Sequence, residues 1–176
     1  MPIFKIHHVA EALKQVEPLS KEVGLKLADD LFESQPNVLA SILALSRMDV
    51  PMRTIDIAFQ IAFICHLAAK AAIEKAPTIS EELQEECLAH LVANAKLLEG
   101  LDSQTVSIAV GAHIRDHSEP YLLAAAHGLL QHHDFKSIGD EAKKHFFLVV
   151  LTVVETFASV VQRVFSNPGM SLNYAG

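Results

Sequence analysis

The chain of 176 residues carries 14 Lys and Arg against 21 Asp and Glu, which gives a formal net charge of −7. Hydrophobic residues make up 51 % and charged residues 20 %, and this balance excludes an intrinsically disordered chain. The length fits one domain that buries enough surface to fold without a disulfide or a metal. Because no basic cluster is present, we expect no nucleic-acid partner.

Alanine and leucine dominate, and no segment alternates like a strand, so the sequence predicts an all-α fold. Ser34-Gln35-Pro36 and Ser118-Glu119-Pro120 each predict a helix start with the serine as N-cap. Gly100 predicts a helix end. The expected helices span roughly 5–17, 20–33, 36–47, 53–76, 80–99, 103–116, 119–133 and 138–166. We expect a bundle in a single domain, residues 1–166, followed by a C-terminal tail, residues 167–176.

Parts of the chain repeat. His8-x5-Lys14-x-Val16-Glu17-x-Leu19 matches His90-x5-Lys96-x-Leu98-Glu99-x-Leu101, and Ser34-Gln35-Pro36 matches Ser118-Glu119-Pro120. The order of helix lengths repeats as well. This pattern predicts two four-helix units, residues 1–78 and 79–166, related by a pseudo-two-fold axis. The alternative is that helices rich in alanine and leucine align by chance.

The two longest predicted helices are apolar around most of their circumference. Such a helix must be covered on all sides. Since eight helices cannot easily wrap two of them, we expect a homodimer in which a second copy covers the remaining surface. The expected interface includes Phe63, Leu67, Thr152, Thr156 and Ser159.

The location is predicted from what the chain lacks. No apolar run of signal-peptide length follows the first residues, which indicates a cytoplasmic protein. Cys65 and Cys87 lie in apolar helical patterns without the spacing of a zinc site, as expected for free thiols in a reducing compartment. The most apolar stretch, residues 146–165, is interrupted by Glu155, Gln162 and Arg163, so we expect a buried helix and no membrane partner.

Ten histidines are the unusual feature of the composition. His113 and His117 have the i, i+4 spacing of paired metal ligands. However, a new helix starts directly after His117, so we expect that residue to lie outside its helix and the pair to separate. Glu155 is a mid-helix carboxylate among apolar residues, and it must be paired, protonated or functional. Four other histidines lie inside separate predicted helices and are the candidate metal ligands: His66, His90, His127 and His145.

A further pattern, His132-His133-Asp134 preceded by Leu129-Leu130, resembles the core motif of HD-domain phosphohydrolases. That family holds metal ions with a lone histidine, the His-Asp pair and a later aspartate. The resemblance covers the His-Asp pair and its apolar lead-in. It implies that His66 is the lone histidine and that it meets His133 and Asp134 at a metal site.

No Walker A loop, Gly-x-Gly-x-x-Gly, Gly-x-Ser-x-Gly or Cys-x-x-Cys motif occurs in the sequence. The sequence therefore predicts a non-enzymatic, cytoplasmic interaction or regulatory protein that forms a homodimer, binds an unidentified protein partner and needs no cofactor. One alternative is a helical bundle that binds a metal or haem through histidines on different helices. The other is a divergent HD-like metal-dependent phosphohydrolase.

Overall fold

The computed structural model describes residues 1–17, 20–73, 76–98 and 103–166, and these form helices without any strand. The helices are α1 (Ile6–Val16), α2 (Lys21–Ser34), α3 (Pro36–Ala44), α4 (Met52–Ala72), α5 (Glu81–Leu98), α6 (Ser103–Asp116), α7 (Pro120–Gln131) and α8 (Asp140–Ser166), with a 3₁₀ turn, η1 (Leu45–Arg47), after α3. The all-α prediction is confirmed, and each helix lies within a few residues of its expected position. The predicted stop at Gly100 and the tail lie outside the described residues.

Two predicted N-caps were wrong by one residue. Pro36 and Pro120 do occupy the first turns of α3 and α7, but the N-caps are Gln35 and Glu119. The residue before a proline is kept out of the helical conformation, so it takes the non-helical N-cap position itself. Ser34 is instead the last residue of α2, where its hydroxyl donates to a backbone carbonyl one turn earlier.

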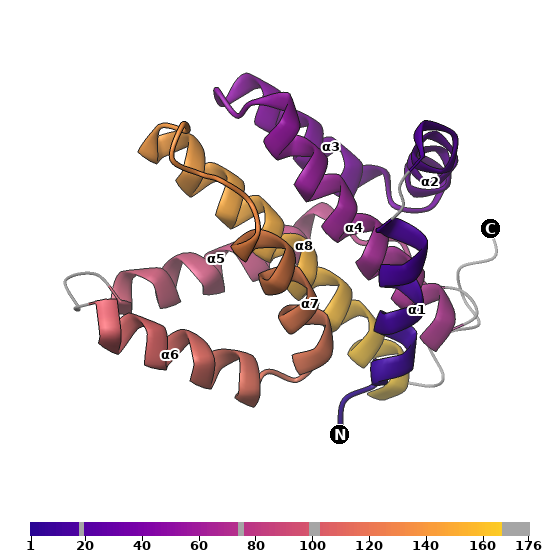
Figure 1. The fold of residues 1–176 in the computed structure, drawn as a ribbon. Coiled ribbons are helices and arrows are strands. Elements are labelled where there is room, and N and C mark those ends of the chain that lie inside the picture. Colours follow the sequence, from indigo (N-terminus) through magenta and orange to yellow (C-terminus); the bar gives the residue numbers. More distant parts are fainter. Residues whose placement is uncertain (18–19, 74–75, 99–102, 167–176) are drawn as a thin grey trace.

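The two long apolar helices, α4 and α8, pack against each other at the centre of the fold (Figure 1). The helix α1 packs on α4, α5 packs on α8, and α3 and α7 each contact both central helices. Six consecutive residues of α4, Ile61 to His66, are buried. The middle of α4 is therefore covered on all sides, as its sequence predicted.

For the middle of α4 this coverage is achieved within one chain, whereas Leu148, Val149 and Leu151 of α8 are only half-buried. Phe63, Thr152 and Thr156 are buried inside the chain, and Leu67 and Ser159 are half-buried. These side chains form no exposed apolar face for a second copy. Self-association of the chain stays a prediction from the sequence. Burial within the chain leaves little of these five side chains to contact a second copy.

By length and composition alone, α4 and α8 are also apolar enough to cross a membrane. In this fold, half or more of the apolar stretch of each helix is buried against other helices of the chain (56 % and 50 %). The central helices of a packed core can have the same length and composition.

Two buried polar side chains tie distant parts of the chain together. Gln35, the N-cap of α3, accepts a hydrogen bond from the N–H of Ile79 at 2.8 Å, just ahead of α5. Glu119, the N-cap of α7, accepts hydrogen bonds from the N–H groups of Ile3 at 3.0 Å and Phe4 at 2.9 Å, just ahead of α1. Gln35, Glu119, Phe4 and Ile79 are all fully buried. The bonds to Phe4 and Ile79 therefore satisfy backbone groups that water does not reach.

Replacing Glu119 by alanine should lower the free energy of unfolding by about 3 kcal/mol or more. The substitution removes a charged acceptor from two backbone N–H groups, and each such bond contributes about 1.5–3 kcal/mol. Glu119→Gln keeps one acceptor oxygen and should lie between alanine and wild type. The matched control is Glu33→Ala, at an exposed position on α2. Equal stabilities of the Glu119→Ala and Glu33→Ala proteins in urea unfolding would contradict this role of Glu119.

Candidate functional site

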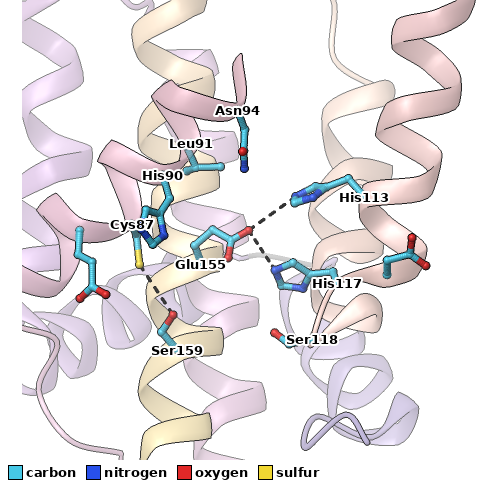
Figure 2. A pocket seen from close by; sticks show the side chains of 11 residues that line it. Cys87, His90, Leu91, Asn94, His113, His117, Ser118, Glu155 and Ser159 are labelled. Atoms are coloured by element: carbon cyan, nitrogen blue, oxygen red, sulfur yellow. Dashed lines mark hydrogen bonds and ion pairs between the residues drawn. The ribbon is translucent and has the colours of Figure 1, made fainter. Parts of the chain in front are cut away.

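A pocket of about 410 Å³, open to solvent, lies between α5, α6 and α8 (Figure 2). Its walls bring together three carboxylates, three imidazoles and several small polar groups, and the lining residues include no lysine or arginine. They are Glu86, Cys87, His90, Leu91, Asn94, His113, Asp116, His117, Ser118, Glu155 and Ser159.

Glu155 of α8 lies at the centre of this pocket (Figure 2). Its Oε1 atom lies 3.0 Å from Nε2 of His117 and 3.8 Å from Nε2 of His113. The rings of His113 and His117 stand edge to face with their centroids 5.6 Å apart. The sequence expectation that Glu155 needs a partner is confirmed. His117 does lie beyond the end of α6, but the expectation that the two imidazoles separate was wrong, because both rings turn towards the same carboxylate.

Both ring nitrogens of His117 are engaged. The backbone N–H of Glu119 donates to Nδ1 at 3.0 Å, so the neutral ring carries its proton on Nε2 and donates it to Glu155. Burial of the His117 ring lowers its pKa, but the hydrogen bond to Glu155 and the charge of that carboxylate outweigh burial, and the pKa of His117 is raised. His117 is therefore a proton donor to Glu155 in either protonation state.

The four histidines predicted as metal ligands lie in different surroundings. His66 is buried in α4, His90 lines the pocket, and His127 of α7 and His145 of α8 are half-buried. Across the described part of the chain, no group of three or more His, Cys, Asp or Glu side chains is placed to hold a metal ion. His117 does not fit a metal either, since the second nitrogen of a metal-bound imidazole donates a hydrogen bond, whereas Nδ1 here accepts one.

The arrangement implied by the HD-domain resemblance is not formed. His133 Nε2 lies 3.1 Å from Oγ1 of Thr54, near the start of α4. Thr54 and His66 are twelve residues apart on that helix (66 − 54), which corresponds to a rise of about 18 Å. Ligands of one metal ion lie about 2 Å from it. His66 and His133 are therefore too far apart to share a metal ion.

The thiol on the pocket wall is not activated. Cys87 Sγ lies 3.8 Å from Oγ of Ser159, one turn beyond Glu155 on α8. Burial raises the pKa of Cys87, and the hydrogen bond to Ser159 only partly offsets this effect. Since the thiolate is the nucleophilic form of cysteine, Cys87 is a weak nucleophile at neutral pH.

A second group of charges surrounds His66. Oδ2 of Asp30, on α2, lies 2.9 Å from Nε2 of His66 and 2.8 Å from Nζ of Lys70. Burial lowers the pKa of His66 in spite of Asp30. The hydrogen bond from Lys70, together with His66, lowers the pKa of Asp30 against the opposing effect of its burial. Asp30 therefore fixes α2 against α4 through an ionised carboxylate.

Both shifts should make the protein less stable in acid. Because the folded-state pKa of His66 is lowered, the unfolded chain takes up a proton at this residue first, near its ordinary pKa of about 6.5. The free energy of unfolding should thus fall as the pH drops below about 6.5, and fall further as Asp30 is protonated. His66→Gln, which still offers an N–H to Asp30, should flatten this pH dependence between pH 7 and 5.5 in urea unfolding. Exposed His132→Gln is the control, and identical slopes for the two variants would contradict the role of His66.

Some residues of the pocket were singled out from the sequence, but their convergence in one pocket was not predicted. Glu155 was recognisable as an isolated carboxylate, and His113 and His117 as a spaced pair, but no pattern linked α6 to α8. Asp30 was missed altogether, because an aspartate among other polar residues of α2 looks like part of a solvated face. Its partners lie 36 and 40 residues further along the chain.

Comparisons of this chain with models of protein families, with curated proteins and with solved structures find no match.

Proposed function

We propose that the protein is a non-enzymatic binding protein, and that the pocket between α5, α6 and α8 receives a small ligand or a side chain of a protein partner. The observation that carries this proposal is the convergence of polar side chains from three helices on one cavity of about 410 Å³. This volume lies in the range of small-molecule sites. The two buried free thiols support the cytoplasmic location that the sequence predicts.

The chemistry of the pocket favours binding over catalysis. A general base needs a free lone pair within reach of the proton that it removes. The proton on Nε2 of His117 points to Glu155, and its Nδ1 lone pair is taken by the N–H of Glu119. The neighbouring Cys87 thiol has a raised pKa. His117 and Cys87 therefore support a role in shaping and holding the site.

A thermal-shift screen of amines, carboxylates, nucleotides and sugars tests this proposal. A compound present at 100 times its Kd adds about 2.7 kcal/mol of stability and should raise the Tm by about 5–10 °C in a protein of this size. Asn94→Trp places a large side chain at the exposed rim of the pocket and should abolish the shift. Lys96→Trp, exposed on the same helix but outside the pocket lining, should leave it unchanged. The proposal is wrong if no class of compound stabilises the protein, or if both variants respond like wild type.

We further propose that residues 1–78 and 79–166 are two copies of one four-helix unit. Equivalent helices pack in equivalent ways: α1 on α4 as α5 on α8, and α2 on α3 as α6 on α7. The hydrogen bonds of the two buried N-cap side chains are also reciprocal. Gln35 of the first unit accepts from the N–H of Ile79 in the second, and Glu119 of the second accepts from the N–H of Phe4 in the first. In each unit a carboxylate and an imidazole join the second helix to the fourth. In the first unit Asp30 of α2 contacts His66 of α4, and in the second unit His113 of α6 contacts Glu155 of α8.

Expressed alone, residues 1–78 should form a helical homodimer, in which a second copy of α4 replaces α8. The physical reason is that the apolar surface of α4 needs the same cover from either partner. Light scattering and circular dichroism measure the mass and the helicity. An unfolded chain or a stable folded monomer would count against the duplication.

A further inference from the structure

We propose that the ligand of this pocket is an organic cation that carries a protonated alkylamine, held at the carboxylate of Glu155. This inference rests on the proposed function, because it assigns a chemical class to the ligand of the same pocket. An alkylammonium group is found both in free di- and polyamines and in the lysine side chain of a protein partner. The experiment below separates these two sources.

The lining of the pocket is rich in hydrogen-bond acceptors. Its three carboxylates, Glu86, Asp116 and Glu155, only accept when ionised, and the amide oxygen of Asn94 accepts as well. No lysine or arginine is among the lining residues, and of the three carboxylates Glu86 is ion-paired with Arg163 from outside the lining. A ligand that brings donors and positive charge therefore complements the lining, whereas an anion meets three carboxylates.

Glu155 is the carboxylate best placed to anchor such a ligand. Glu86 is already paired with Arg163 at 2.9 Å, and the side chain of Asp116 is 78 % exposed, where ion pairs contribute little. The side chain of Glu155 is only 22 % exposed, so its charge is less screened by solvent. Both histidines approach it through Oε1, which leaves Oε2 for the ligand. An ammonium group offers three donors to Oε2 and to neighbouring oxygens such as that of Ser159.

Size and ligand geometry favour an organic cation over a metal ion. The cavity of about 410 Å³ is much larger than a single ion and matches a chain of several heavy atoms. Among the described residues no set of three metal-ligating side chains converges. His117 presents a proton, and not a lone pair, towards Glu155.

The charged and titratable groups that face Glu155 give this site a pH dependence. His113 and His117 approach from the α6 side, and His90 and Glu86 line the pocket from α5. The pKa of His117 is raised by Glu155, and when this imidazole becomes charged it competes with an ammonium group for Glu155 and repels it. Binding of an amine should therefore weaken as the pH falls from 8 to 6.

Isothermal titration calorimetry on the full chain at pH 8 tests the inference with four probes: 1,4-diaminobutane, Nα-acetyl-lysine amide, butyrate and Zn²⁺. Both amines should bind, and butyrate and Zn²⁺ should not. Glu155→Gln keeps the shape of the side chain but loses its charge, and it should weaken amine binding by about tenfold or more. Glu141→Gln, an exposed glutamate on the same helix, should change the Kd by less than about twofold.

The relative affinities of the probes identify the source of the ligand. Tighter binding of the diamine indicates a free polyamine, and tighter binding of the lysine amide indicates a lysine of a protein partner. If Glu155→Gln fails to fold, the wild-type protein still decides the matter: amine binding must weaken with added salt and with acidification from pH 8 to 6. Amine binding whose affinity changes neither with added salt nor with this acidification overturns the inference.

The outcomes also separate this inference from the proposed function. If a neutral or anionic compound binds and Asn94→Trp abolishes its binding, the pocket is a binding site but the ligand class is wrong. The same holds if Zn²⁺ binds and the amines do not. If no compound of any class binds, the proposed function and this inference fail together.

Discussion

The fold depends on the requirement that two long apolar helices be covered on every side. Neither α4 nor α8 has a polar face wide enough to meet solvent along its length, so the two helices pack on each other, and α1 covers a further face of α4 as α5 does of α8. The remaining gaps are filled by α1, α3, α5 and α7, which lie against this central pair. In contrast, α2 and α6 lie further from the centre, and each packs on its neighbour in sequence. That difference determines where the molecule has room for a pocket.

The position of the pocket follows from Glu155, a charged residue among the apolar residues of α8. A carboxylate in a helix that is otherwise buried needs a partner, because the uncompensated charge is costly in an apolar environment. Glu155 finds that partner in His117, at the turn between α6 and α7. The α6 wall is thus held to α8 through a polar contact, and the space between them stays open and polar. The cavity that remains beside this carboxylate has a volume of about 410 Å³ and is open to solvent.

Much of the architecture was predictable, because helix periodicity and proline positions are local signals. Phe63 and Leu67 interrupt the polar face of the predicted helix 53–76 and indicated that the middle of α4 is surrounded, and Pro36 and Pro120 mark two helix starts. The polar contacts were not predictable, because their partners are remote. Glu119 bonds to residues 116 and 115 positions away, and Gln35 to one 44 positions away. A glutamine or glutamate before a proline looks like an ordinary turn residue until the fold buries it. The same is true of His113 and His117, whose approach to each other depends on a carboxylate from another helix.

The bond between Glu119 and the first residues of the chain also bears on how the protein is made. Ile3 and Phe4 are synthesised well before their acceptor, which follows more than a hundred residues later. At about 5–20 residues per second, the start of the chain waits on the order of ten seconds for its partner. During that time α1 can pack on α4, but the segment ahead of it has two backbone groups without their final acceptor. The segment ahead of α1 is thus synthesised long before the residue that fixes its native place.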